Sequence, residues 1–456
     1  MRAVRLTVAT ATFGLASLGV GSFAAVPAAA TIAIQPDIAM SRLVSTGAPP
    51  TTAQCVAEFQ VPCYSPNQIE QAYNLAPLYA KGYDGAGKTI VIVDSFGSTT
   101  VRRDLAVFDK AFHLPAPPSF KIIQPAGPVT TADPGWAGET DLDVEYSHAI
   151  APGANILLVE TPTSENEGRT GFPQIEEAEN YVINHHLGDV ISQSFSATEE
   201  TFPTRQALTS LRGAYINAAK NNITVNTASG DSGAADVGFL GNYYYTYPVT
   251  SWPDSDPLVT GVGGTQLHLN AKGNHTAPDN VWNDTYNVPT QEFIFGDAGP
   301  NPLAGGGGKS IYFSRPSYQN SVASVVGSQR GVPDISMSGA CNGAAIMYQS
   351  FPGGGAPGFY EVCGTSEATP LFSGIVAIAD QYAGHDLGVI NPALYKLSQD
   401  GAPGIVDVTK GNNTVTFTQD TTHTVVGFKA LPGYDLASGV GTVNAALFVP
   451  ELAGAG

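Results

Sequence analysis

Basic side chains are scarce in this sequence. It has 20 Lys and Arg residues against 39 Asp and Glu residues, so its formal net charge at pH 7 is -19. Such a chain repels phosphate groups, which argues against nucleic acid or an anionic membrane as a partner. Charged residues make up only 13% of the chain and hydrophobic residues 43%. A chain of 456 residues with this composition can bury a large core within one big domain.

Long apolar runs are missing after residue 30, so no later segment offers the roughly 18 continuous apolar residues that a membrane span needs. One apolar run stands at the start, behind Arg2 and Arg5 and ahead of small residues near Ala30. This order predicts a secretory signal peptide over 1–30, with a membrane anchor as the alternative interpretation. We therefore expect a mature protein that is secreted, extracellular, not bound to a membrane and monomeric.

Cysteine is rare as well, with four residues that permit three pairings. Export favours disulfides. Cys55 with Cys63 and Cys341 with Cys363 are the closest pairs in the sequence. The second pair would staple the segment that leads into Ser366, and a plain surface staple is an equal alternative. No cysteine spacing is typical of a metal site.

The segment 31–64 lacks a clear hydrophobic period and is rich in Ala, Pro and Thr, which predicts a linker or a short propeptide remnant. The folded domain is expected over 65–450. At its start, Ser65 fits a helix cap, Pro66 the first turn and Gln68 the third position of a capping box.

Beyond this start, short Val- and Ile-rich runs alternate with helical patterns. The expected strands are 88–94, 154–160, 189–195 and 223–229, and the expected helices are 100–112, 173–186 and 204–222. Alternation of this kind is typical of a mainly parallel sheet covered by helices. The sequence therefore predicts an α/β fold, a single large domain with helices on both faces of one sheet.

One motif points to a different class of protein. The stretch GYDGAGKT, 82–89, satisfies the phosphate-loop pattern, so an ATPase has to be considered. A phosphate loop follows a strand and opens a helix, whereas this motif precedes the expected strand. The ATPase is the least favoured hypothesis, and it requires nucleotide binding that disappears in Lys88→Ala.

The stretch VCGTSEATP, 362–370, places Ser366 just before an expected helix, as proteases place a nucleophilic serine. A serine hydroxyl is a weak nucleophile until an oriented base removes its proton, and the usual base is a histidine held by an aspartate. Asp94 lies in a stretch similar to the aspartate segment of subtilisin-like proteases. However, none of the eight histidines stands in a His-Gly-Thr segment, and His148, the best-placed substitute, is a poor one.

Carboxyl groups can supply another base. Glu139 and Asp143 are four residues apart, so on a helix they share one face at roughly 6 Å, and the second carboxylate can orient the first. At about 100° per residue, His148 lies about 180° around that helix from Glu139. Asp141 and Glu145 form their own pair on another face, for which we expect a solvated acidic stripe.

Asp231, in ASGDSGAAD, follows the expected strand 223–229 in a tight loop with Gly230 and Gly233. Glycines let the backbone approach another group closely, so the carboxyl group is placed rather than merely exposed. On its own, a Gly-Asp-Ser-Gly stretch is more often a plain turn. A protonated Asp231 could donate a hydrogen bond to a developing oxyanion.

Three motifs, Glu-x-x-x-Asp at 139–143, Ser-Gly-Asp at 229–231 and Gly-Thr-Ser-x-x-x-Pro at 364–370, occur in this order. Together they resemble the sedolisin family of serine-carboxyl peptidases. The stretches 64–75 and 305–319 also resemble the family's mature start and its glycine-rich substrate loop. The order and the spacing of the motifs make this resemblance specific.

The resemblance covers 64–448 and implies a subtilisin-like fold and a secreted endopeptidase that acts on proteins or peptides in acid. It implies Ser366 as nucleophile, Glu139 as general base and later acid, Asp143 as its orienting partner, and Asp231 as oxyanion donor. A carboxylate base accounts for activity in acid solution. Glu has a reference pKa of about 4.3 and His one of about 6.5, so a Glu can still accept a proton where a His is already protonated.

Members of this family also hold a calcium ion near the C-terminus, and the resemblance implies one structural Ca²⁺ here. Asp407 and Asp435 match the side-chain ligands, and Val408, Leu431 and Gly433 match the residues that offer backbone carbonyls. Ligation by oxygen alone is what calcium prefers. The alternative is that the two aspartates only cap turns.

The sequence departs from the family's pattern in several places. The long prodomain of the family has no counterpart, because only 31–64 separates the signal peptide from the domain. Ser-Phe-Ser at 194–196 stands where the family often has Ser-Trp-Gly. Asp94 stands where some members have a glutamate connected to the catalytic carboxylates. The alternative is that Asp94 forms a turn after its strand. These departures motivate a second hypothesis, a catalytically silent binding protein on the same fold, although every catalytic position is filled.

Overall fold

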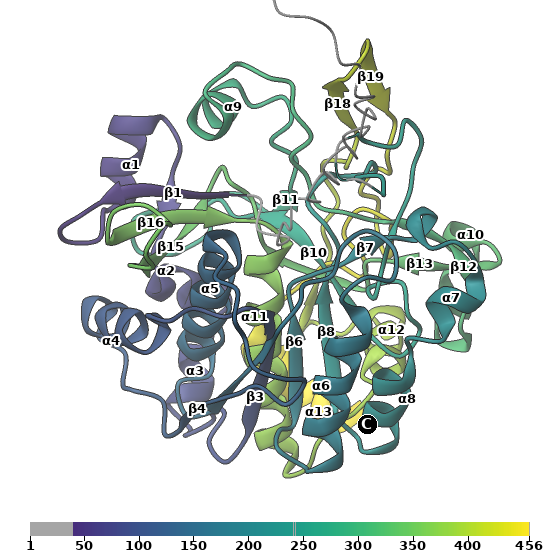
Figure 1. Cartoon of the computed structure of the whole chain (residues 1–456), viewed down its shortest axis with the longest axis horizontal. Helices are drawn as coiled ribbons and strands as arrows, with labels where there is room; N and C mark the ends of the chain where they lie inside the picture. The colour runs from purple at the N-terminus through teal and green to yellow at the C-terminus, as the bar shows by residue number, and fades with distance from the viewer. Residues whose placement is uncertain (1–39, 240, 242, 456) are drawn as a thin grey trace, which may run out of the picture. The chain divides into compact units, whose positions relative to one another are not determined.

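The computed structural model describes residues 40–239, 241 and 243–455 (Figure 1). The predicted signal peptide, 1–30, lies outside the described residues. Within them, no helix combines the length and the apolar character that crossing a membrane requires.

An eight-stranded sheet forms the core of the described domain. Its strands follow the order β11, β10, β8, β6, β3, β5 and β4, and β14 also pairs with β10. Their bounds are β3 Thr89–Ser95, β4 Phe120–Ile123, β5 Asn155–Thr161, β6 Val190–Gln193, β8 Thr224–Ala228, β10 Thr260–Gln266, β11 Asn280–Val281 and β14 Ile335–Ser338. All pairings are parallel except that of β10 with β11. The predicted α/β fold with a mainly parallel sheet is confirmed.

Alternate side chains of the central strands enter two separate cores. Ile90 and Ile92 of β3 join one apolar cluster, whereas Val91 and Val93 join the other. Because successive side chains of a strand point to opposite faces, helices must cover both faces of this sheet.

The two sets of helices can be followed in Figure 1. The first core contains α2 Pro66–Ala72, α3 Ala76–Tyr79, α4 Val101–Phe112, α5 Pro134–Ile150, α11 Thr365–Ala383, α12 Asn391–Asp400 and α13 Ala445–Ala455. The second contains α6 Phe172–Asn184, α7 Arg205–Thr209 and α8 Gly213–Lys220.

A second sheet leads into Ser366. Its order is β1 (Met40–Ser45), β16 (Gly358–Cys363), β15 (Ala344–Gln349) and β2 (Cys63–Tyr64). β1 runs antiparallel to β16, the strand that ends just before α11. This sheet therefore fixes the position at which α11 begins.

The folded domain starts earlier than predicted. Between β1 and β2 lies α1 (Thr52–Phe59), whose cap Thr51 forms a capping box with Gln54. The prediction of a linker followed by a domain from residue 65 overlooked this cap, because the apolar positions of 40–64 are too few to show a period. The disulfides join Cys55 to Cys63 and Cys341 to Cys363, so the pairs closest in sequence are confirmed.

The remaining elements are short. They are β7 Ala197–Thr198, η1 Glu199–Thr201, β9 Ser251–Trp252, α9 Val288–Phe295, β12 Gly308–Ser314, η2 Ser317–Val322, α10 Ala323–Val326, β13 Gln329–Val332, β17 Ile405–Val406, β18 Val415–Thr418, β19 Thr422–Val425 and β20 Thr442–Val443.

The phosphate-loop motif lies in the turn that precedes β3, as its place in the sequence indicated. Lys88 Nζ lies 2.5 Å from Asp386 Oδ1 and 3.8 Å from Asp189 Oδ1. The lysine is held by two carboxylates, and its motif opens a strand instead of a helix. Nothing in this arrangement favours the ATPase hypothesis.

Candidate active site

Ser366 is the second residue of α11 and is fully buried. The residue before the helix, Gly364, has φ of 130°, a backbone conformation that favours glycine. The helix is 19 residues long, so its N-terminus carries the positive end of a substantial dipole beside the serine hydroxyl. This end suits the stabilisation of negative charge that develops near Ser366.

Helix α5 carries the carboxyl pair and packs beside α11 (Figure 1). Its cap Asp133 accepts hydrogen bonds from the backbone N–H groups of Gly135 and Trp136. A Cβ on Gly374 of α11 would lie 2.8 Å from Ile150, so glycine allows the close approach of the two helices. Glu139 and Asp143 lie in the middle of α5, and both are fully buried.

Ser194 joins the two helices. Its hydroxyl donates a hydrogen bond of 2.9 Å to Oδ1 of Asp143 and lies 3.5 Å from the backbone carbonyl oxygen of Ser366. The side chain of Ser194 therefore connects Asp143 to the N-terminus of α11. Since Glu139 is one helical turn before Asp143, both carboxyl groups occupy the face of α5 that we predicted.

Asp231 reaches the same helix from the loop after β8. Its Oδ1 accepts hydrogen bonds from the backbone N–H of Thr365 at 2.7 Å and from the Thr365 hydroxyl at 2.8 Å. The same hydroxyl accepts a hydrogen bond of 3.1 Å from the N–H of Gly230. The structure thus brings Asp231 and Asp143 to the N-terminus of α11, where Ser366 lies.

Burial dominates the electrostatics of the site. It raises the pKa of Asp143 well above its usual range, the neighbouring Asp94 raises that pKa further, and the hydrogen bond from Ser194 lowers it. Burial also raises the pKa of Asp94 to about 7. Asp94 is therefore close enough to influence Asp143, as expected for a residue that supports the carboxyl pair.

His148 lies elsewhere. Its Nε2 is 2.7 Å from the carbonyl oxygen of Pro115 and 3.3 Å from Oδ1 of Asp109. These partners belong to α4 and the segment after it. The prediction that Glu139 and His148 face different sides of α5 agrees with these contacts.

Sequence reasoning missed some residues and misjudged others. It treated 194–196 only as a backbone edge for substrate, although the position of Ser194 directly after a buried strand could have pointed to its hydroxyl. Phe195 is buried against Phe172, with 6.3 Å between the ring centroids. The solvated stripe expected for Asp141 and Glu145 is wrong, because both side chains are fully buried.

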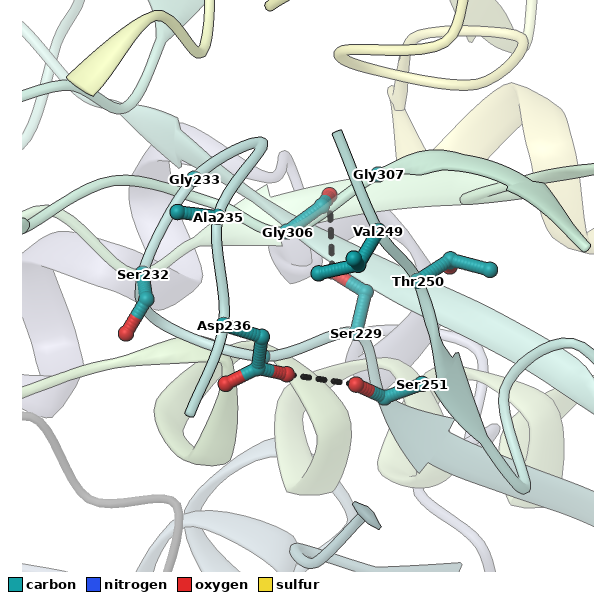
Figure 2. Close-up of a pocket in the computed structure, with 11 residues that line it drawn as sticks. Ser229, Ser232, Gly233, Ala235, Asp236, Val249, Thr250, Ser251, Gly306 and Gly307 are labelled. Atoms are coloured by element: carbon teal, nitrogen blue, oxygen red, sulfur yellow. Dashed lines mark hydrogen bonds between the residues drawn. The ribbon is translucent and has the colours of Figure 1, made fainter. Parts of the chain in front are cut away.

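A pocket adjoins the loop of Asp231 (Figure 2). It is lined by Ser229, Gly230, Ser232, Gly233, Ala235, Asp236, Val249, Thr250, Ser251, Gly306 and Gly307. Ser229 donates a hydrogen bond to the carbonyl oxygen of Gly306, and Ser251 donates one to Asp236. A Cβ on Gly306 would lie 1.9 Å from the carbonyl oxygen of Ser229, so only glycine fits this wall.

The residues expected to bind calcium gather at one loop. Oδ2 of Asp407 accepts a hydrogen bond from the N–H of Gly433, and Oδ2 of Asp435 accepts one from the N–H of Leu431, both at 2.9 Å. The two carboxylates thus hold the same loop from different segments of the chain. Carboxylate and carbonyl oxygens are the ligands that Ca²⁺ prefers. Oδ1 of Asp435 also accepts hydrogen bonds from the N–H groups of Ala437 and Ser438, as an aspartate that caps a turn does.

Comparisons with known proteins agree with this architecture. A sequence profile of the subtilase family matches residues 130–393. Kumamolisin of Bacillus sp. (strain MN-32) is 30% identical over 83% of this chain and 62% of its own length. Sedolisin of Pseudomonas sp. (strain 101) is 28% identical over 79% of this chain and 57% of its own length. The chain therefore spans about three fifths of the length of these two relatives.

A solved structure is similar over most of the chain. Pseudomonas sedolisin, a serine-carboxyl proteinase complexed with two molecules of pseudo-iodotyrostatin, has a TM-score of 0.71 and 26% identity. The similarity covers 86% of this chain and 98% of the sedolisin chain. This chain belongs to the subtilase family, and over most of its length it is similar to kumamolisin and sedolisin.

Proposed function

We propose that this protein is a secreted endopeptidase that works in acid and cleaves peptide bonds through an acyl-enzyme on Ser366. One observation carries the proposal. The N-terminus of α11 is hydrogen-bonded to Asp231 through Thr365, and Ser194 links Asp143 to the Ser366 backbone. Two carboxyl groups therefore flank a buried serine at the positive end of a long helix.

In this mechanism, Glu139 removes the proton of the Ser366 hydroxyl as its oxygen attacks the substrate carbonyl carbon. Asp143, held by Ser194, orients Glu139. The carbonyl oxygen becomes an oxyanion, to which protonated Asp231 donates a hydrogen bond. Because Oδ1 of Asp231 already accepts two bonds from Thr365, the proton belongs on Oδ2.

The tetrahedral intermediate then collapses. Glu139 returns its proton to the leaving amine, the C–N bond breaks, and the acyl group stays on Ser366 as an ester. A water molecule repeats the sequence: Glu139 takes its proton, hydroxide adds to the ester carbon, and the proton returns to the serine oxygen. The product is a free carboxyl group, and the hydroxyl of Ser366 is restored.

The substrates proposed are proteins or peptides bound in extended form, and the enzyme is proposed to act as a monomer. The pocket of Figure 2 shares Gly230 and the following loop with Asp231, so its surface is where a substrate side chain near the scissile bond would pack. Its small lining residues and the carboxyl group of Asp236 favour a polar side chain over a large apolar one.

A structural Ca²⁺ is proposed at Asp407 and Asp435, with the carbonyl oxygens of Val408, Leu431 and Gly433. A bound ion supplies positive charge that joins carboxylates from two segments of the chain. Its effect would be on the stability of the C-terminal loops, since these residues are not among those that surround Ser366.

The second candidate is a catalytically silent binding protein on the same fold. It is favoured by Phe195 and Ser196, which stand where the family often has Trp and Gly. Covalent labelling separates the two candidates, because a peptide aldehyde forms a stable adduct only with an activated serine.

The experiment is intact-mass analysis at pH 4 after incubation with a peptide aldehyde, together with an assay of casein hydrolysis. The wild type is expected to gain one inhibitor mass and to degrade casein. Ser366→Ala is expected to do neither, with activity lowered on the order of 10⁴-fold or more. Ser336→Ala, which changes a buried serine on β14, serves as the control. An unlabelled wild type without hydrolysis would favour the silent binding protein.

A further inference from the structure

Helix α5 has a second acidic face, formed by Asp141 and Glu145. Both side chains are fully buried. Oε2 of Glu145 accepts a hydrogen bond of 3.0 Å from the N–H of Tyr348 on β15. This face therefore packs into the interior against β15, and it is distinct from the face that carries Glu139 and Asp143.

Helix α4 adds a third carboxyl group to this interior. Oδ2 of Asp104 accepts a hydrogen bond of 2.9 Å from the N–H of Ser350, and its Oδ1 accepts one from the Ser350 hydroxyl. The Arg103 side chain, which is 63% exposed, lies 3.6 Å from the same carboxylate. Asp104 thus has the hydrogen-bond donors that an ionised carboxylate needs.

Asp141 contrasts with Asp104. Among the described residues, neither of its carboxyl oxygens meets a hydrogen-bond donor in good geometry, although the Ser98 hydroxyl lies near enough to lower its pKa. A fully buried carboxyl group without such donors pays heavily for ionisation. The folded protein therefore favours the protonated, neutral form of Asp141.

Among residues 40–239, 241 and 243–455, no Lys or Arg is buried against this cluster. The neighbouring elements contribute further acids: Asp94 of β3, beside Glu160 of β5, and Asp109 of α4. Arg103 lies beside Asp104 from the surface, Arg102 acts on Glu160, and His148 Nε2 lies 3.3 Å from Oδ1 of Asp109. On other sides of α5, Glu367 of α11 and Glu70 of α2 add to the effect of burial, which raises the pKa of Tyr146.

These contacts agree with the direction of the pKa shifts. The pKa of Asp141 is raised well above its usual range by burial and then by the charge of Asp104. The pKa of Glu145 is raised by burial and then by Asp141, and the Tyr348 N–H lowers it in part. Asp104, which accepts two hydrogen bonds from Ser350, thus stands beside two carboxyl groups whose burial favours the neutral form.

We propose that Asp104, Asp141 and Glu145, packed between α4, α5 and β15, form an acid-dependent lock that holds these three elements together only while Asp141 and Glu145 carry protons. The folded state of this lock binds more protons than the unfolded chain. By linkage, the free energy of unfolding is greatest below the unfolded pKa of about 4 and declines as pH rises toward the folded pKa values.

The lock regulates the candidate active site if the proposed function is correct. Helix α5 carries Glu139 and Asp143, so loosening its contact with α4 and β15 withdraws the proposed base from Ser366. An exported enzyme of this kind would lose both its fold and its activity in a neutral medium. The stability claim itself does not rest on peptidase activity.

The test is the melting temperature of the full mature chain between pH 3 and pH 8. All variants carry Ser366→Ala, which prevents self-digestion. The lock predicts a fall of many degrees between pH 4 and pH 7 in this background. Asp141→Asn and Glu145→Gln remove the ionisable group with little change of shape, and each is expected to flatten the fall. Asp400→Asn, in an exposed pair with Lys396, is the control and should leave it unchanged.

Parallel curves for Asp141→Asn, Glu145→Gln and the Ser366→Ala background would overturn the lock. A second measurement counts protons directly. Calorimetry at pH 6 in buffers of different ionisation enthalpy counts the protons released on unfolding. The lock predicts that the Ser366→Ala background releases more protons than its Asp141→Asn variant, whereas equal release contradicts it. Since hydrolysis is not measured, failure here is separate from failure of the proposed function.

Discussion

Ser194 shows how a single residue can tie the candidate site together. Its hydroxyl donates to Asp143 on α5 and also lies near the Ser366 carbonyl on α11. A hydrogen bond to an ionised carboxyl group stabilises the charged form, which is why Ser194 lowers the pKa of Asp143. The hydroxyl thus offsets part of the effect of burial on the pKa of Asp143.

Ser194→Ala is expected to lower kcat by about 10-fold, with little change in KM, because a hydrogen bond to a charged group contributes about 1.5–3 kcal/mol. The pKa of Asp143 should rise when this donor is lost, so the acid limb of the pH–activity profile should move to higher pH. The measurement is kcat and KM from pH 2 to pH 7. A profile that superposes on that of the wild type would show that Ser194 does not act on the carboxyl pair.

At the residue scale, the sequence located the candidate site residues better than it predicted which side chains are buried. The Glu139 and Asp143 pair and the loop of Asp231 could be located because their spacing and glycines have a local physical meaning. Their roles in catalysis stay predictions. The burial of Asp141 and Glu145 could not be foreseen, since it depends on α4 and β15, which come from distant parts of the chain.

At the scale of elements, most strands and helices of the central domain followed from hydrophobic patterns, because buried parallel strands are continuous apolar runs. The helix expected over 204–222 is divided into α7 and α8. The segment 40–64 was misjudged for a different reason. Its β1 is stabilised by pairing with β16, and its α1 is held by the disulfide between Cys55 and Cys63. Neither kind of stabilisation leaves a periodic pattern within the segment.

The C-terminal loops offer a prediction at the same scale. If Asp407 and Asp435 hold Ca²⁺, saturating calcium at 100 times Kd should stabilise the fold by about 2.7 kcal/mol. The melting temperature should therefore rise on addition of calcium to chelator-treated protein. Asp407→Ala should abolish this rise, whereas Asp420→Ala, in the exposed β18–β19 turn, should preserve it. A calcium response that persists in Asp407→Ala would place the ion elsewhere.

At the scale of the whole molecule, we propose two separate sources of acid dependence. One is the proposed carboxylate base, which can accept a proton in solutions where histidine is already protonated. The other is the lock of Asp104, Asp141 and Glu145, which opposes the fold as pH rises. If both proposals hold, the chemistry and the stability of this chain are confined to acid solution.

The measurement that tests the central claim most directly is proteolysis across pH 2 to pH 8 by the wild type, Glu139→Gln and His148→Ala. Removing a general base is expected to lower kcat by about 10² to 10⁴-fold. We predict this loss in Glu139→Gln at every pH, and an acid optimum with nearly full activity in His148→Ala. Intact activity in the glutamate variant, with loss in the histidine variant, would show that an imidazole and not a carboxyl group activates Ser366.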